Sequence, residues 1–166
     1  MNTSVISEKA KIGQNVEIGH FCIIEDNVII GNNVVIGNYC VIKKGAIIGD
    51  NCKFTAYCEI RDKVKIGNNT TFGSRCTISA NAVIGENVTI KYGFVLTDTP
   101  VLELNNEKTV GYIGDNTLIG ANVTLMPGFN IGKNATIGAC SQVRNDVNDN
   151  EIWYGNPAKL FKVKTH

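Results

Sequence analysis

A six-residue repeat of large apolar side chains runs through almost the whole sequence and restricts the folds open to it. Isoleucine, leucine or phenylalanine occupies every sixth position from Ile6 to Leu96 without a break, and the spacing resumes from Ile113 to Val143. A smaller residue, such as Cys22, stands two places before most of these positions. Two inward residues at a spacing of two, repeated every six residues, indicate a short strand followed by a corner. The sequence therefore predicts a solenoid of very short strands.

A longer period of 18 residues sets the shape of each coil. The tetrapeptide Ile-Gly-x-Asn begins at Ile12, Ile30, Ile48, Ile66, Ile84, Ile113 and Ile131. Three hexapeptides therefore form one triangular coil, and successive coils of a parallel solenoid stack about 4.8 Å apart. The gap of 29 residues between Ile84 and Ile113 exceeds one coil by eleven. We expect these extra residues to form one loop that protrudes from the solenoid at about residues 97–112.

Two further columns of residues recur at this 18-residue spacing. Asparagines stand at positions 15, 33, 51, 69, 87, 116 and 134, where they can adopt positive φ and hydrogen-bond their copies in the next coil. Phe21, Tyr39, Tyr57 and Arg75 share another corner. The first interpretation of this second column is an aromatic stack with a cation over its end, which could support a subunit contact, and a ligand role is the alternative.

An inward aliphatic residue followed by glycine, with a small residue four places on, resembles the hexapeptide-repeat acyltransferase superfamily. The closest likeness is to N-acetyltransferases that act on nucleotide-linked amino sugars, and it covers roughly residues 5–160. The segment Gly155-Asn156-Pro157-Ala158-Lys159 resembles the tail of acetyl-CoA-dependent members. The fold class implied is all-β: a left-handed parallel β-helix of about seven triangular coils with one protruding loop and a short C-terminal tail. The handedness comes from the resemblance alone.

The resemblance also implies an organisation and an assembly. We expect a single domain over residues 1–166, with coils at about 4–145, the protruding loop at 97–112 and the tail at 146–166. Members of the superfamily are usually homotrimers with active sites between subunits, and a protruding loop helps to wall each site. We expect the same partners here, together with a small-molecule acceptor.

The expected acyl donor is acetyl-CoA, and small residues in the late coils are candidates to contact its pantetheine arm. They are Ala121, Gly138 and Ala139, whose small side chains let a ligand approach the backbone. Pro157 and Lys159 of the tail are further candidates for binding the donor, with Lys159 placed to meet its phosphates. Lys133 could do the same, although an exposed corner lysine without a role explains it equally well.

The sequence departs from the superfamily pattern because the loop has no histidine to act as a general base. The chain has two histidines, His20 in the first coil and His166 at its end. Asp98, at the start of the loop, is therefore the candidate catalytic residue, as a base or as the group that orients a sugar amine. A weak base favours an amine acceptor over a hydroxyl. The histidine count also argues against the metal site of γ-class carbonic anhydrases, and we expect no metal.

Charge and cysteine usage narrow the partners and the compartment. The net charge is +1 and no basic cluster is present, which argues against nucleic acid as a partner. No run of about 18 apolar residues is present, so we expect no membrane span. Five cysteines fall at the small inward positions without a pairing pattern, and Cys140 falls at a corner. Unpaired buried thiols are typical of a reducing, cytoplasmic environment.

These observations favour an enzyme that transfers an acetyl group from acetyl-CoA to the amine of a nucleotide-linked deoxysugar. Two alternatives stay open. One is an O-acetyltransferase acting on a sugar, an antibiotic or an amino acid. The other is a non-catalytic β-solenoid scaffold, which the missing histidine would suit but which needs neither the loop nor the tail.

Overall fold

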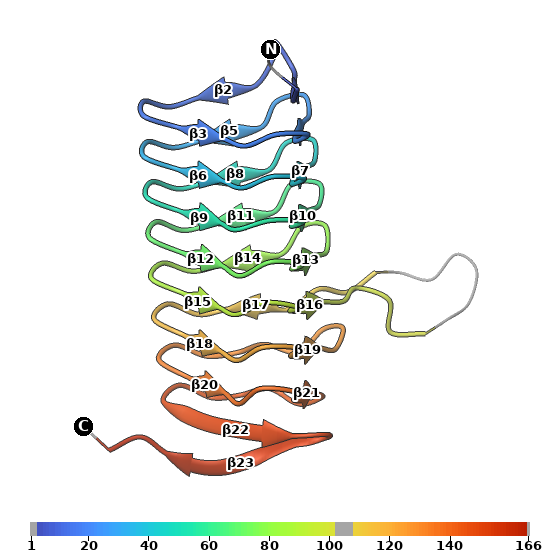
Figure 1. Cartoon of the computed structure of the whole chain (residues 1–166). Helices are drawn as coiled ribbons and strands as arrows, with labels where there is room; N and C mark the ends of the chain where they lie inside the picture. The colour runs from blue at the N-terminus through green and yellow to red at the C-terminus, as the bar shows by residue number, and fades with distance from the viewer. Residues whose placement is uncertain (1–2, 102–107, 166) are drawn as a thin grey trace.

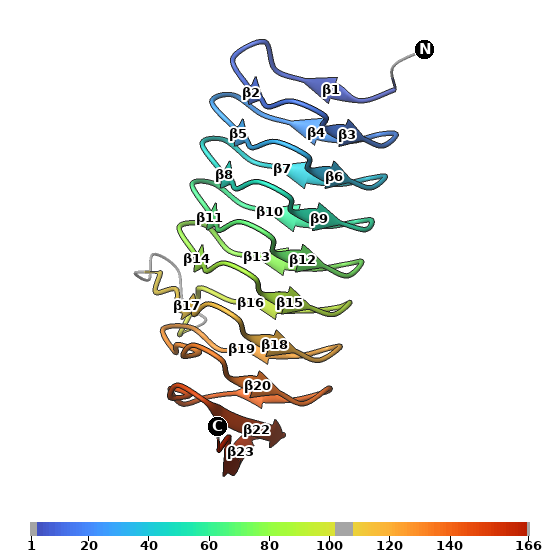
Figure 2. The same cartoon turned by 90° about the vertical axis from the view of Figure 1, so that its left-hand side faces the viewer.

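The chain winds into a left-handed parallel β-solenoid that places one short strand on each of three faces per coil (Figures 1 and 2). The structure is a computed structural model and describes residues 3–101 and 108–165. The predicted fold class is confirmed. Within the described ranges no helix is long and apolar enough to cross a bilayer.

The strands form three sheets, one per face. Sheet A contains β1 (Val5–Ile6), β4 (Ile23–Ile24), β7 (Val41–Ile42), β10 (Glu59–Ile60), β13 (Thr77–Ile78), β16 (Val95–Leu96), β19 (Thr124–Leu125) and β21 (Gln142–Val143). Sheet B contains β2 (Lys11–Ile12), β5 (Ile29–Ile30), β8 (Ile47–Ile48), β11 (Lys65–Ile66), β14 (Val83–Ile84) and β17 (Tyr112–Ile113). Sheet C contains β3 (Glu17–Ile18), β6 (Val35–Ile36), β9 (Lys53–Phe54), β12 (Thr71–Phe72), β15 (Thr89–Ile90), β18 (Leu118–Ile119), β20 (Thr136–Ile137), β22 (Glu151–Gly155) and β23 (Ala158–Val163).

The hexapeptide repeat fills the interior as the sequence predicts. Ile42, Ile60 and Ile78 are fully buried, and so are smaller partners such as Val28 and Ala46. Backbone hydrogen bonds join each coil to the next; for example, the Val41 N–H donates to the Cys58 carbonyl at 2.9 Å. Because each strand pairs with the one 18 residues later, a single apolar column runs behind each sheet.

Three corners join the sheets, and each uses residues with positive φ. The first corner, between sheets B and C, carries the asparagine column, with φ from 55° to 59° at Asn15, Asn33 and Asn51. The amide Nδ2 of each asparagine donates to Oδ1 of the next, as between Asn51 and Asn69 at 3.1 Å. The second corner joins sheets C and A, and the third joins sheets A and B. Only a few residue types adopt this backbone without strain, which explains the excess of asparagine.

The asparagine ladder gives a first testable prediction. Asn51→Ala removes the hydrogen bonds to Asn33 and Asn69, at 3.2 and 3.1 Å, and leaves alanine at φ 59°. We expect unfolding to become easier by about 2 kcal/mol, measured from urea transitions. Asn51→Gly loses the same hydrogen bonds but adopts positive φ freely, so its loss should be about half as large. Equal losses in the two variants would contradict the conformational part of this account.

The last coil is shorter than the others. Ile131 pairs with Val147, and Asn134 Nδ2 donates to Asn150 Oδ1 at 3.1 Å, in both cases across 16 residues instead of 18. Two residues are missing from the third corner of this coil, between β21 and Val147. Sheet A accordingly has eight strands, one more than about seven coils would give, because the chain continues the solenoid past residue 145 and ends in the antiparallel β22–β23 hairpin.

The cysteines lie where the repeat places them. Cys22, Cys40, Cys52, Cys58 and Cys76 are buried free thiols, and Cys140 is exposed at the second corner. Burial raises the pKa of Cys52, and its Sγ–H donates to the Gly67 carbonyl at 3.2 Å. The inward cysteines therefore act as small apolar side chains that fill the core.

Candidate functional site

The single outgrowth of the solenoid leaves the third corner between β16 and β17 (Figure 1). Its base is held by the backbone: the Thr109 N–H donates to the Asp98 carbonyl at 2.9 Å, and Thr97 Oγ1 donates to the Leu125 carbonyl at 2.9 Å. Residues 102–107, the middle of the predicted loop, lie outside the described ranges. Asp98 therefore stands on a fixed position although it begins an irregular segment.

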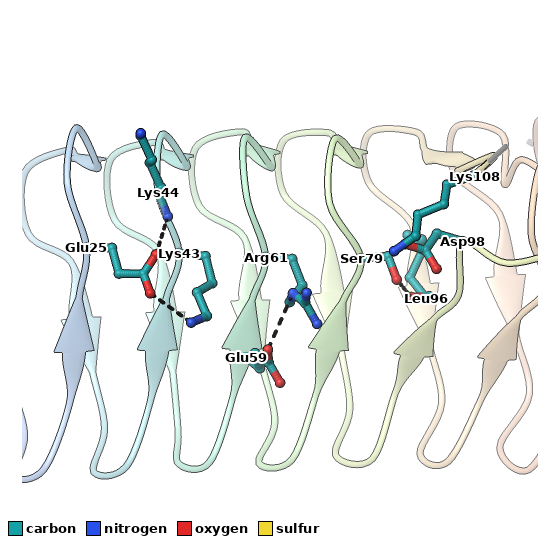
Figure 3. A network of polar contacts seen from close by, with 9 residues as sticks. All are labelled: Glu25, Lys43, Lys44, Glu59, Arg61, Ser79, Leu96, Asp98 and Lys108. Carbon is teal, nitrogen blue, oxygen red and sulfur yellow. Dashed lines mark hydrogen bonds and ion pairs between the residues drawn. The ribbon is translucent and has the colours of Figure 1, made fainter. Parts of the chain in front are cut away.

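The Asp98 carboxylate is the most enclosed charged group at this base, with a side chain 18% exposed. Thr99 Oγ1 donates to Oδ1 at 2.9 Å, and Lys108 Nζ lies 3.3 Å from Oδ2 (Figure 3). Lys108 is 65% exposed, so its ammonium can leave at small cost. One carboxylate oxygen is thus fixed, and the other already holds a primary ammonium group.

A hollow of about 480 Å³ opens beside this carboxylate, and we call it the outgrowth hollow. It is lined by Thr77, Ser79, Val95, Leu96, Thr97, Asp98, Thr99, Pro100, Met126 and Pro127. Ser79 Oγ donates to the Leu96 carbonyl at 2.7 Å and closes one wall (Figure 3). The lining is mostly apolar with one carboxylate, an arrangement typical of a site that orients a small amine.

The predicted donor residues of the late coils lie together at the second corner and on the adjoining part of sheet C. Gly138 and Ala139 line a hollow of about 410 Å³, which also includes Gly120 and Leu118. Ala121 lies beside it, because its carbonyl accepts the Cys140 N–H at 2.8 Å. We call this surface the late-coil hollow.

The structure gives a separate reason for glycine at position 138. A Cβ there would lie 2.7 Å from the Cβ of Tyr154, and the Gly138 N–H donates to the Trp153 carbonyl at 2.8 Å. Packing of the last coil therefore requires a small residue at this position, whether or not a ligand approaches it. The sequence did not reveal this contact, because Tyr154 lies beyond the visible repeat.

Pro157 and Lys159 lie in the β22–β23 hairpin, and both are exposed. Lys159 pairs with Tyr154 across the hairpin, and the Gly155 N–H donates to Ser141 Oγ at 3.0 Å, which ties the turn to the second corner. These two residues therefore belong to the same end of the molecule as the late-coil hollow. Lys133 lies elsewhere, at the first corner, where its Nζ is 3.0 Å from Asp115 Oδ2.

Asp98 and the late-coil residues do not meet within one chain. Sheet A separates them: its strands begin at the second corner and end at the third. Gly93 and Asp98 mark the two ends of one strand, and five residues of extended chain span about 16 Å. Figure 2 shows the corresponding arrangement, with the outgrowth on one edge and the second corner on the opposite edge.

A buried carboxylate fixes the C-terminal hairpin to the last coil. Glu151 accepts hydrogen bonds from the Asn148 N–H at 2.8 Å, from Asn148 Nδ2 at 3.1 Å and from the Trp153 indole at 2.8 Å. Burial alone raises the pKa of this carboxyl, but the hydrogen bonds from Asn148 and Trp153 outweigh burial and lower the pKa below its usual value. The folded state therefore prefers the charged form of Glu151.

This preference predicts an acid transition that Trp153, the one tryptophan of the sequence, can report. Because the folded pKa of Glu151 is lowered, its contribution to stability is present above 4.5 and is lost as pH falls through the lower folded value. We expect a change in tryptophan fluorescence with a midpoint below pH 4.5. Glu151→Gln should abolish that transition, while Glu17→Gln, at an exposed position, should leave it unchanged. A transition that survives Glu151→Gln would refute the assignment.

Comparisons with known proteins agree with this architecture. A family model described as GMPPB C-terminal domain matches residues 2–111, and one described as bacterial transferase hexapeptide (six repeats) matches residues 111–145. A Saccharomyces cerevisiae protein named "Putative acetyltransferase YJL218W" is 42% identical over 53 residues, which are 32% of this chain and 27% of that protein. The chain therefore spans about a quarter of the length of this curated relative.

Two solved structures extend the likeness. Soybean serine acetyltransferase is 34% identical with a TM-score of 0.52, over 58% of this chain and 40% of that chain. The UDP-N-acetylglucosamine acyltransferase of Francisella novicida is 21% identical with a TM-score of 0.69, over 98% of this chain and 70% of that chain, and shows the shared fold. The chain therefore belongs to the GMPPB C-terminal domain family and, through its repeats, to the hexapeptide-repeat acyltransferase superfamily.

Proposed function

We propose that this protein transfers an acetyl group from acetyl-CoA to a small acceptor, the amine of a nucleotide-linked deoxysugar. The observation that carries the proposal is the Asp98 carboxylate in the outgrowth hollow, where one oxygen already holds the primary ammonium of Lys108. An acceptor amine can take the place of that lysine. The relatives named as acetyltransferases support acyl transfer as the reaction class.

The donor would lie on the late-coil hollow. Ala121, Gly138 and Ala139 leave the backbone open to a pantetheine arm, and Pro157 with Lys159 stands at the same end to meet phosphates. Because sheet A separates this surface from Asp98, a complete site requires the outgrowth of one subunit to reach the late coils of another. We therefore propose a homotrimer with its active sites between subunits.

The chemistry needs few groups. The neutral amine attacks the thioester carbonyl, a backbone N–H stabilises the oxyanion, and the carbon–sulfur bond breaks to release coenzyme A as the thiolate. The new amide forms, and the proton lost by the nitrogen ends on the thiolate. Asp98 orients the amine and accepts its hydrogen bond during the attack. The five buried free thiols fit a cytoplasmic location for this reaction.

The direct test is release of free thiol from acetyl-CoA in the presence of nucleotide-linked amino sugars, hydroxyl sugars and amino acids. We expect release with the amines. Release with hydroxyl acceptors alone, or a product acetylated on oxygen, would instead identify an O-acetyltransferase. No release with any acceptor, together with no acetyl-CoA binding by calorimetry and a monomeric mass, would support the non-catalytic scaffold and refute the proposal.

A further inference from the structure

The column of side chains at the second corner changes character halfway along the solenoid. Phe21, Tyr39 and Tyr57 occupy its first part with φ between 56° and 59°, and the rings stack at centroid distances of 5.2 and 4.9 Å. Arg75 follows at φ 60°, and the next residue is Gly93 at φ 72°. The ladder of large side chains therefore stops, and the coil of Gly93 leaves a gap in it.

This gap forms the largest of the hollows described here, about 660 Å³, and we call it the edge groove. It is lined by Thr55, Ala56, Tyr57, Gly73, Ser74, Arg75, Lys91, Tyr92, Gly93 and Asn122. It runs along the second corner, the row of turns that joins sheet C to sheet A on the right of Figure 2. None of the candidate site residues discussed above belongs to it.

The groove is positively charged. Arg75 and Lys91 line it, no carboxylate does, and neither cation forms an ion pair with any residue in the described ranges. Ser74 and Thr55 add hydroxyl groups, joined to each other at 2.8 Å. Two unpaired cations beside hydroxyl donors are suited to a diphosphate, which arginine can bind through two hydrogen bonds.

The groove also offers an uncovered aromatic face. Tyr39 covers one side of the Tyr57 ring, with an angle of 2° between the planes. The cation expected over the other side is not there: among the described residues the cation–π contact is that of Lys162 with Phe161, and Arg75 makes none. Tyr57 is 55% exposed, and Tyr92, on the far side of the gap, is 59% exposed. A planar base can stack on such a ring.

We propose that the edge groove binds a nucleoside diphosphate, with the base against Tyr57 and Tyr92 and the diphosphate on Arg75 and Lys91. The inference deepens the proposed function and rests on it in one respect, because it identifies this ligand as the nucleotide part of the acceptor. The groove lies along the same corner as the donor surface: Asn122 closes it, and the next position in the column is Cys140, beside Ala139.

Calorimetric titration of the whole protein with UDP, GDP, uridine and inorganic pyrophosphate tests the two halves of the groove. We expect UDP and GDP to bind at least about tenfold more tightly than uridine or pyrophosphate, since each probe that lacks one half loses one set of contacts. Failure of both diphosphates to bind, or equal binding of pyrophosphate and UDP, would overturn the proposal.

Variants with asparagine, which tolerates positive φ, separate binding from folding. Tyr57→Asn and Arg75→Asn should each weaken UDP binding by about tenfold. Phe21→Asn is a close control for Tyr57→Asn, because Phe21 is 54% exposed and stacks on the opposite side of Tyr39. Lys63→Asn, at φ 57° on the third corner, is the control for Arg75→Asn. If the controls weaken binding as much as the groove variants, the groove is not the site.

Gly93→Asn gives a third, independent variant, because it should fill the gap. A Cβ at Gly93 would lie 2.2 Å from Asn122 Oδ1, the end of a side chain that can turn away and join the new amide as the other asparagines do. We expect a folded protein with UDP binding reduced by about tenfold or more. Wild-type UDP affinity in a folded Gly93→Asn variant would place the nucleotide elsewhere.

Failure of this inference can be distinguished from failure of the proposed function. UDP binding that depends on Tyr57 and Arg75, without thiol release from acetyl-CoA, would retain the groove and refute the transferase. Acetylation of free amino sugars as fast as of nucleotide-linked ones, unchanged in Arg75→Asn, would retain the transferase and refute the groove.

Discussion

Asp98→Asn is expected to lower kcat/KM for the amine acceptor by about 100-fold, with KM for acetyl-CoA unchanged. The substitution keeps the shape of the side chain but removes the charge that now holds the Lys108 ammonium at 3.3 Å. An amide can still accept one hydrogen bond, yet it cannot balance the positive charge that develops on the attacking nitrogen. The measurement is steady-state thiol release over a range of acceptor concentrations.

Two controls separate this role from a structural one. Asp62→Asn changes a carboxylate at the same corner two coils before the outgrowth, and should leave both constants unchanged. Lys108→Ala removes the ammonium that competes with the acceptor, so KM for the amine should fall slightly. Turnover by Asp98→Asn equal to that of the wild type would refute the site assignment, although the reaction class could still stand.

The fold could be predicted because the repeat depends only on nearest neighbours. Each inward residue between Ile6 and Leu96 packs against its copies one coil away, so a regular spacing in the sequence becomes a regular column in space. The prediction failed to reach Val147 because the last corner loses two residues, and a spacing of 16 falls outside an 18-residue pattern.

The site was less accessible to sequence reasoning, because its contacts cross irregular segments. Asp98 could be singled out as a carboxylate at the start of the loop, but the positions of Thr99 and Lys108 against it depend on the path of the outgrowth. The edge groove arises from the absence of a side chain at Gly93, whose consequence appears only when the neighbouring coils are stacked. Arg75 was expected over Tyr57, and the side-chain conformation that decides this is not encoded in the 18-residue spacing.

Gly37→Ala is expected to be the most destabilising of the substitutions proposed here, and it tests the stacking of coils directly. A Cβ at Gly37 would lie 1.2 Å from the carbonyl oxygen of Thr55 in the next coil, and a backbone atom cannot move aside as a side chain can. The Gly37 N–H donates to the Phe54 carbonyl at 2.8 Å, so separating the two coils also strains this hydrogen bond. We expect a loss of about 3 kcal/mol or more, or roughly 6–12 °C in the thermal midpoint.

Gly45→Ala is the matched control, because it changes the same atoms for a different physical reason. Its added Cβ would meet nothing closer than Lys63 Cγ at 3.5 Å, so the cost comes only from a backbone with φ of 71° and should be about 1 kcal/mol. The ratio of the two losses therefore measures close approach between coils against backbone strain within one coil. Equal thermal midpoints for the two variants would mean that Thr55 does not pass over Gly37, which would contradict the pairing of β6 with β9 on which sheet C is built.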